Sequence, residues 1–330
     1  MKYGRIAPIL SPSMLTMNEE KRRAKILDGA RVAEDIKREV SREAARLKDE
    51  HGYVPCLVAV RVGNDPASAV YVRNKVRTCK TLGLRSEHHE LPEETTTDEL
   101  LAEVGTLNAR DDVDGILVQL PLPRGIDEAR VIEAIDPAKD VDGFHPLNVG
   151  RLTLGRTGFA PCTPAGIVEL LTRESVQITG RHACIVGRSH IVGRPLAQLL
   201  LQHDATVTVC HSRTSELASL TRQADILVAA VGQIGLIRAE HVKPGATVID
   251  VGMNKLADIE TARDFFGEGV AARLEAIGKR GFTLVGDVHP AEVERVAGSL
   301  TPVPGGVGPL TVAMLMQNTL TAARLRRGLS

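Results

Sequence analysis

Residues 182–200, HACIVGRSHIVGRPLAQLL, contain the stretch that decides the fold. The apolar residues 183–186 run into a turn that holds Gly187 and Gly193, and an apolar helix-forming stretch follows. A strand, a glycine-rich turn and a helix in this order aim the amides of a helix N-terminus at a pyrophosphate. The turn departs from GxGxxG, because Ser189 and Val192 occupy the second and third glycine positions. On its own it fits either a dinucleotide site or a tight structural turn.

The next predicted strand favours NADP over NAD. Residues 206–210, TVTVC, are followed by His211, Ser212 and Arg213. An NAD site usually places an acid at this strand end to bind the ribose hydroxyls, whereas this chain offers a hydroxyl and cations. Arg188 in the turn adds a second cation, so the surroundings suit a 2′-phosphate. The alternative is that Ser212 and Arg213 only form a solvated loop.

Strands and helices alternate on both sides of this motif, which predicts an α/β fold with parallel sheets covered by helices. Further strands are predicted at 57–62, 115–120, 226–231, 247–251 and 282–285. Helices are predicted at 33–47, 67–82, 126–135, 165–173 and 310–325. Thr96 and Glu99 form a predicted capping box ahead of another helix, and Thr163 a predicted N-cap. Residues 136–163 read as a loop and 258–280 as a charged surface excursion.

The length, charge balance and cysteine content of the chain limit the kinds of function it can have. The 330 residues suggest about two domains. Lys plus Arg and Asp plus Glu number 41 each and aromatic residues only 2%, which argues against nucleic acid as a partner. The five cysteines form no CxxC pair, so we expect buried reduced thiols and no metal site. No membrane span or secretory segment is apparent, and we expect a cytoplasmic protein.

Polar residues in the N-terminal half are candidates for catalysis. Tyr71 and Lys75 are four apart on one predicted helix and share a face. Gln119 lies near the carboxyl end of an apolar strand, where ligands bind in open α/β sheets. Asp140 and Asp142 lie in a turn. Each also has a plain interpretation: a surface lysine beside a tyrosine, a strand-end amide, and solvated acids.

Residues 302–309, PVPGGVGP, precede the last predicted helix. Their three glycines permit close approach of backbone to a ligand, and Pro309 suits a first helical turn. A flexible connector is the alternative, although the prolines make this segment stiffer than a linker.

Together these segments closely resemble the bifunctional methylenetetrahydrofolate dehydrogenase/methenyltetrahydrofolate cyclohydrolase family. The matching segments are YVRNK (71–75), GILVQLPLP (115–123), KDVDGFHP (139–146), GRSHIVGRP (187–195), VIDVG (248–252) and PVPGGVGP (302–309). Their order and approximate spacing match from Lys25 onward, and several long motifs in one order are far more specific than any alone.

The resemblance implies two α/β domains with a cleft between them. After an N-terminal extension, residues 1–23, it implies a folate-binding catalytic domain over 24–165, completed by a C-terminal helix over 309–330. Residues 166–308 would form a Rossmann-like NADP-binding domain. The implied partner is a folate substrate, and the implied assembly a homodimer.

The resemblance also implies residue roles. Lys75 would be the key catalytic group, Gln119 its hydrogen-bond partner, Tyr71 the residue that packs on the folate rings, and Asp142 the one that binds the pterin. Further folate contacts would come from Val118, Leu120, Pro304, Gly305, Gly306, Val307 and Gly308. NADP contacts would come from Gly187, Arg188, Ser189, Ser212, Arg213 and Met253.

The expected chemistry has two steps. Hydride loss from the methylene bridge mainly needs alignment with the nicotinamide, because the folate nitrogens stabilise the resulting cation. Hydrolysis of that cation needs proton transfer, which a lysine oriented by Gln119 can supply.

A protein that keeps only one activity, or a non-catalytic binder of NADP or folate, is the alternative. The stretch between Gly252 and Gly286 is longer than the family usually has, and it has no assigned role.

Overall fold

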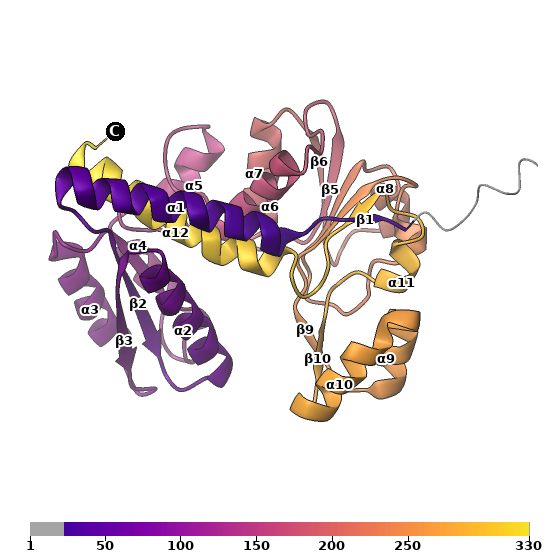
Figure 1. Cartoon of the computed structure of the whole chain (residues 1–330), viewed down its shortest axis with the longest axis horizontal. Coiled ribbons are helices and arrows are strands. Elements are labelled where there is room, and N and C mark those ends of the chain that lie inside the picture. The colour runs from indigo at the N-terminus through magenta and orange to yellow at the C-terminus, as the bar shows by residue number, and fades with distance from the viewer. Residues whose placement is uncertain (1–22, 330) are drawn as a thin grey trace, which may run out of the picture.

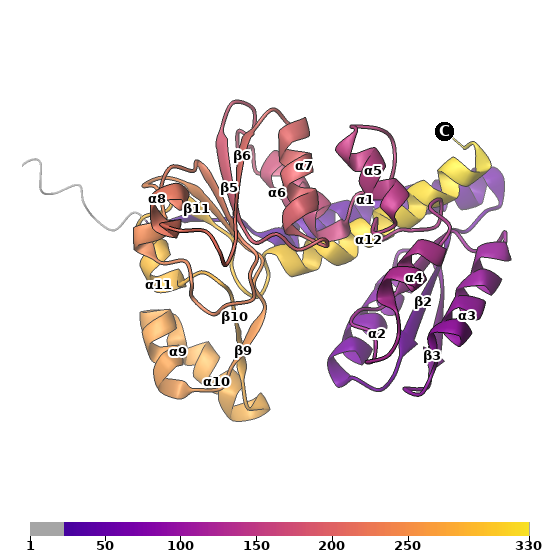
Figure 2. The ribbon, with the colours of Figure 1, turned by 180° about the vertical axis from the view of Figure 1, so that it is seen from behind.

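Two α/β domains are joined by a pair of long helices that lie side by side (Figures 1 and 2). The structure, a computed structural model, describes residues 23–329, so the predicted extension 1–23 lies almost wholly outside the described residues. The two long helices are α1 (Gly29–His51) and α12 (Val307–Arg327). One continuous apolar core takes residues from both helices and both sheets. The predicted two-domain α/β fold is confirmed.

The first domain is built on a three-stranded parallel sheet in the order β3-β2-β4. Its strands are β2 (Cys56–Val62), β3 (Arg85–Leu91) and β4 (Gly115–Val118). Its helices are α2 (Pro66–Thr81), α3 (Thr97–Ala109) and α4 (Glu128–Ala134). Every residue of the central strand β2 is buried, as expected for a strand covered on both faces. The capping box at Thr96 and Glu99 is confirmed.

The second domain holds a six-stranded parallel sheet in the order β1-β11-β8-β7-β5-β6. Its strands are β1 (Lys25–Ile26), β5 (His182–Val186), β6 (Thr206–Cys210), β7 (Ile226–Ala229), β8 (Thr247–Asp250) and β11 (Ser299–Leu300). Its helical elements are α6 (Cys162–Arg173), α7 (Gly193–Gln202), α8 (Leu217–Thr221), η2 (Ala239–His241) and α11 (Pro290–Val293). The chain runs from β5 to β6 on one side and returns to β7 on the other. Ligands bind at such a switch point, at the carboxyl ends of the strands.

Several elements differ from the sequence expectations. Residues 25–26, which we assigned to the first domain, form β1 and pair with β11 in the second. The predicted loop 136–163 contains α5 (Pro146–Thr153). Thr163 is not an N-cap, because α6 already begins at Cys162; its hydroxyl instead hydrogen-bonds that of Thr311 in α12 at 2.8 Å.

Residues 258–280, predicted as a charged surface segment, belong to a small subdomain with helices and strands of its own. β10 (Thr283–Val285) does not join the parallel sheet but pairs antiparallel with β9 (Asn254–Leu256). Between these strands lie α9 (Ile259–Phe266), η3 (Gly267–Val270) and α10 (Ala271–Arg280). They pack around an apolar cluster of their own. In Figure 1 this orange segment lies beyond one end of the six-stranded sheet.

A buried carboxylate fastens the C-terminal end of α12 to the first domain. Asp114, which is 0% exposed, accepts hydrogen bonds from Arg326 at 3.1 Å and from Arg327. Its other oxygen accepts from the Tyr53 hydroxyl at 2.7 Å and from the Cys56 amide at 2.9 Å. Asp114 is not among the residues predicted from the sequence.

All five cysteines are buried and free of disulfides, as predicted. Within residues 23–329, no helix is both long enough and apolar enough to cross a lipid bilayer.

Candidate active site

The predicted catalytic residues Lys75 and Gln119 are in direct contact. Lys75 lies on α2 and is 9% exposed, and Gln119 follows β4. The lysine Nζ donates to Gln119 Oε1 at 3.1 Å. The amide nitrogen of Gln119 donates to the carbonyl oxygen of Leu120 at 2.6 Å, which turns its oxygen toward the lysine. The glutamine therefore fixes the position of the ammonium without adding a charge.

Asp142 completes this cluster electrostatically. Burial raises the pKa of the Asp142 carboxyl, and the charge of Lys75 opposes that shift while the charge of Asp140 adds to it. Its Oδ1 atom lies 3.7 Å from the buried Cys162 Sγ. Asp142 is therefore only partly exposed, and it lies close enough to Lys75 for the two charges to interact.

The neighbouring Asp140 has a structural role. Its carboxylate accepts from the amides of Phe144 and His145, at 3.2 and 2.9 Å, and from the side chain of Asn148 at 2.9 Å. The expectation of a solvated acid is wrong for Asp140, which is 2% exposed and holds the turn that presents Asp142.

Tyr71 links this cluster to the second domain. It lies one helical turn before Lys75 on α2, and its side chain is 43% exposed. Its hydroxyl lies 2.7 Å from the sulfur of Met253, which follows β8. A residue predicted to bind folate and a residue predicted to bind NADP therefore meet where the two domains face each other.

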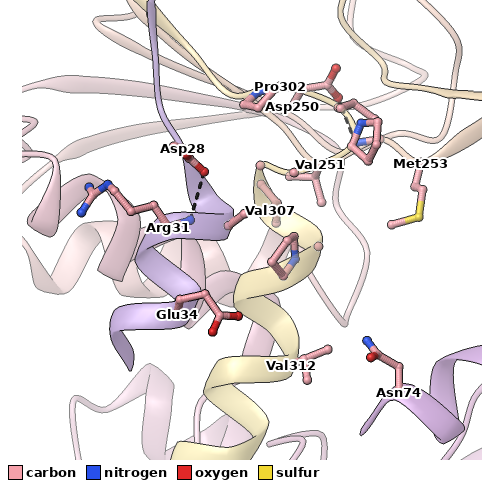
Figure 3. Close-up of a pocket in the computed structure, with 18 of the residues that line it drawn as sticks. Asp28, Arg31, Glu34, Asn74, Asp250, Val251, Met253, Pro302, Val307 and Val312 are labelled. Atoms are coloured by element: carbon pink, nitrogen blue, oxygen red, sulfur yellow. Dashed lines mark hydrogen bonds between the residues drawn. The ribbon is translucent and has the colours of Figure 1, made fainter. Parts of the chain in front are cut away.

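A pocket of about 590 Å³ opens at this meeting point (Figure 3). Tyr71 and Asn74 line it from α2, and Met253 from the second domain. The remaining wall comes from residues 250–252 at the end of β8, from residues 302–309, and from the N-terminal parts of α1 and α12. Lys75, Gln119 and Asp142 are not lining residues, but Tyr71 connects their cluster to the pocket.

Residues 302–308 form the predicted glycine-rich wall. Gly305 has a φ of +107°, which favours glycine, and its carbonyl oxygen accepts from the Ala30 amide at 2.8 Å. A Cβ on Gly29 would lie 1.8 Å from the Gly306 oxygen, so only glycine allows α1 to approach this closely. Sequence reasoning missed Gly29, although a glycine directly after the capping Asp28 was a signal.

Two of the predicted folate contacts, Val118 and Leu120, do not line the pocket. The side chain of Val118 is 6% exposed and packs in the core of the first domain, away from the pocket. Leu120 is partly buried, and its carbonyl oxygen holds the Gln119 side chain. Val307 and Gly308 lie in the first turn of α12, which begins three residues before the predicted helix 310–325.

In the predicted pyrophosphate turn, Gly187 and Gly193 allow backbone segments to approach so closely that a side chain would clash. A Cβ on Gly187, whose φ is +131°, would lie 2.2 Å from the Ala230 oxygen at the end of β7. A Cβ on Gly193 would lie 2.1 Å from the Gly187 oxygen. The Ser189 hydroxyl accepts from the Val192 amide at 3.1 Å. The turn thus lies at the switch point of the sheet, directly before the N-terminus of α7.

The predicted cations lie at the same edge of the sheet. β5 and β6 pair in parallel with Val186 opposite Cys210, so Arg188 and Ser212 emerge from neighbouring strand ends. Arg188, Ser212 and Arg213 are all exposed. Neither arginine forms an ion pair with a residue in the described part of the chain. Uncompensated cations and a hydroxyl suit a phosphate group.

Two buried acids that sequence reasoning missed support this edge. Asp287 is 0% exposed and accepts from the amides of Val231, Gly232 and Gln233 in the loop after β7. Asp250 lies at the end of β8, and burial raises its pKa to about 7. Asp250 belongs to a recognised motif, but no pattern in the sequence distinguished either acid from a solvated one. Among residues 23–329, no cluster of His, Cys, Asp and Glu side chains is arranged to hold a metal ion.

Comparison with known proteins gives consistent matches over most of the chain. The family model "Tetrahydrofolate dehydrogenase/cyclohydrolase, catalytic domain" matches residues 27–142, and the corresponding NAD(P)-binding domain matches residues 161–327. A "Bifunctional protein FolD" from Koribacter versatilis is 55% identical, covering 92% of this chain and 98% of that protein.

Solved structures agree with these matches. The bifunctional FolD enzyme from Campylobacter jejuni is 43% identical with a TM-score of 0.83, covering 92% of this chain and 99% of that one. The Trypanosoma brucei methylenetetrahydrofolate dehydrogenase-cyclohydrolase, solved with NADP cofactor and inhibitor, is 39% identical with a TM-score of 0.84 and the same coverage.

Proposed function

Because the chain belongs to the tetrahydrofolate dehydrogenase/cyclohydrolase family, we propose that it performs two consecutive steps on a folate. The first is NADP-dependent oxidation of 5,10-methylenetetrahydrofolate to 5,10-methenyltetrahydrofolate. The second is hydrolysis of that product to 10-formyltetrahydrofolate. The observation that carries the proposal is the hydrogen-bonded pair of Lys75 and Gln119 beside Asp142, one helical turn from the pocket between the domains.

The second domain offers the groups that NADP needs. Gly187 and Gly193 would hold the pyrophosphate, and Arg188, Ser212 and Arg213 the 2′-phosphate. When bound, NADP supplies a nicotinamide ring that accepts a hydride. Met253, on the pocket wall beside Tyr71, adds an apolar contact that helps to exclude water from the site.

In the oxidation step the chain's residues mainly bind and orient. The Asp142 carboxyl suits the amino-pyrimidinone edge of the pterin, whose paired N–H groups match two carboxylate oxygens. Tyr71, on the pocket wall, offers an aromatic face to the folate rings. The methylene carbon loses a hydride and becomes a cation that the adjacent folate nitrogens stabilise, so no side chain has to move a proton.

The hydrolysis step does require proton transfer. Water adds to the methenyl carbon and loses a proton, and one of the two carbon–nitrogen bonds then breaks as its nitrogen gains a proton. Lys75 in its amine form can take the proton from water at Nζ and return it to the departing nitrogen. Gln119 holds Nζ in place through its amide oxygen, which accepts from the lysine in either protonation state.

A steady-state assay with 5,10-methylenetetrahydrofolate, run separately with NADP and NAD, tests this function. We expect NADP-dependent formation of reduced nicotinamide, and consumption of added methenyl substrate above the buffer rate. Accumulation of the methenyl compound would leave a dehydrogenase alone. Absence of turnover with either nucleotide, despite NADP binding, would favour a non-catalytic binder.

Replacing Ser212 with aspartate should weaken the preference for NADP. The new carboxylate would repel a 2′-phosphate and could accept hydrogen bonds from ribose hydroxyls. We expect the ratio of kcat/KM for NADP to that for NAD to fall by about tenfold. Ser215→Asp, in the same exposed loop, is the matched control. An unchanged ratio in Ser212→Asp would contradict the assignment of this strand end.

Replacing Asp142 with alanine should weaken folate binding in both steps. Loss of charge-assisted hydrogen bonds to the pterin is expected to raise KM for both folate substrates by about tenfold or more. The KM for NADP should stay near the wild-type value, as should all constants of Asp49→Ala on the exposed face of α1. Unchanged folate constants would remove Asp142 from the site.

The homodimer and the cytoplasmic location remain proposals. The resemblance supports the former, and the composition and cysteine usage support the latter.

A further inference from the structure

The subdomain of residues 254–285 leaves and rejoins the second domain beside the pocket. It follows Met253, which lines the pocket, and returns at Gly286, where a Cβ would lie 1.7 Å from an Asp250 carboxylate oxygen. Figure 2 shows β9 and β10 rising from α9 and α10 toward this edge of the sheet. An element attached at two points of the pocket edge can influence the pocket wall.

Arg273 of α10 makes the contact that reaches the wall. Its guanidinium donates to the carbonyl oxygen of Val303 at 2.7 Å and to that of Leu284 at 3.3 Å. It also lies over the Phe266 ring, 4.4 Å from the centroid. It forms no ion pair with any described residue. Burial lowers the pKa of Arg273, so these carbonyl contacts must compensate for lost hydration.

Val303 belongs to the pocket wall itself, with every residue from 302 to 309. Backbone hydrogen bonds tie this wall to Ala30 of α1 and, through Thr301, to Val248 in β8. Of the side chains in the described range, Arg273 alone donates to a carbonyl of residues 302–308. Among residues 23–329, the side-chain hydrogen bond to a carbonyl of this wall therefore comes from the subdomain.

The subdomain has other attachments that do not depend on Arg273. Phe265 packs so closely on Gly235 that a Cβ there would lie 2.7 Å from the ring. The same ring lies 4.8 Å from that of His289. The β9–β10 pairing continues up to Asn254 and Val285. Removal of the Arg273 side chain should therefore leave the subdomain docked and the protein folded.

We propose that Arg273 is a positioning residue for the folate reaction: by donating to the Val303 carbonyl oxygen, it holds residues 302–308 in the position that binds the folate substrate. This inference rests on the proposed function. The subdomain thereby becomes part of the substrate-binding site. Loss of the Arg273 contact should weaken binding of the folate and leave the phosphate contacts of NADP unchanged.

The test compares Arg273→Ala, Arg273→Lys and Arg280→Ala with the wild type. Arg280 is exposed at the end of the same helix, so its removal controls for charge and for helix content. Tetrahydrofolate and NADP affinities are measured by titration calorimetry, and kcat and KM for 5,10-methylenetetrahydrofolate by steady-state assay. Melting temperatures report on folding.

In Arg273→Ala we expect tetrahydrofolate affinity to fall, and the folate KM to rise, by about tenfold, the loss of one charged hydrogen bond. The kcat should change less, because the wall binds ground state and transition state alike. NADP affinity should be unchanged. Arg273→Lys, which can still donate to Val303, should recover most of the loss, and Arg280→Ala should match the wild type.

Unchanged tetrahydrofolate affinity in Arg273→Ala would overturn the proposal. So would an equal loss of affinity for both ligands that lysine does not restore, because that pattern indicates general packing. If Arg273→Ala fails to fold, Arg273→Met decides, because methionine keeps an apolar side chain against Phe266 but cannot donate to Val303. Tetrahydrofolate affinity near wild type in Arg273→Met would overturn the proposal. A wild type that binds no tetrahydrofolate refutes the proposed function, whereas equal binding by wild type and variant refutes only the role of Arg273.

Discussion

Replacing Lys75 with alanine is expected to slow hydrolysis of 5,10-methenyltetrahydrofolate by about 10²–10⁴-fold, the usual contribution of a positioned acid–base group. The variant removes the only group of the Lys75–Gln119 pair that can exchange a proton with water. Oxidation should suffer less, because that step needs alignment and not proton transfer. The methenyl compound should therefore accumulate during turnover, which its absorbance reports directly.

NADP affinity is the internal control for this variant, because the proposed phosphate contacts lie in the second domain, at the carboxyl ends of β5 and β6. Lys80→Ala is the matched replacement: Lys80 is exposed near the end of the same helix and should be dispensable. Full cyclohydrolase activity in Lys75→Ala would refute the assignment. Equal loss of both activities would point instead to folate binding as the role of the lysine.

Replacing Asp114 with alanine should lower the free energy of unfolding by about 3–5 kcal/mol, as expected when one partner of a buried ion pair is removed. Arg326 and Arg327 would lose their carboxylate, and the Tyr53 hydroxyl and the Cys56 amide would lose an acceptor. Urea denaturation followed by circular dichroism measures the change. The end of α12 should detach first, since these contacts hold it to the first domain.

Asp112→Ala is the control that separates the effect of losing a buried carboxylate from the effect of losing any carboxylate. Asp112 lies two residues away and bonds Arg85 and Arg110 at the surface, where its side chain is 49% exposed. Exposed ion pairs are usually worth up to about 1 kcal/mol, so this variant should remain close to wild type. If Asp112→Ala and Asp114→Ala destabilise equally, the buried network is not what fastens α12.

Apolar strands and glycine-rich turns were predictable because their signals are local. The runs at 57–62 and 183–186 are apolar because parallel strands are buried on both faces. β3 escaped prediction because its sequence, RSEHHEL, is polar at an edge of its sheet. β1 and β11 are two residues each, too short for any periodicity, and only tertiary pairing reveals them.

The same distinction applies to the site. Tyr71 and Lys75 share a helix face by spacing, and Gln119 lies at a strand end, so sequence could propose them together. The contact of Tyr71 with Met253 and the approach of Gly29 to Gly306 join segments far apart in the chain, and no local pattern encodes them. Asp287 was missed for a related reason, since its amide partners lie 54–56 residues earlier.

The pairing of α1 with α12 has a consequence for synthesis on the ribosome. α1 is made long before its partner α12, and one apolar core contains both helices. Domains generally fold as units while the chain grows, N-terminal ones first. Here the first domain would wait for α12, and a chain released before Val307 would lack the helix that begins at the pocket. Premature termination would therefore yield no half-active enzyme, only a product with an exposed core for proteases to remove.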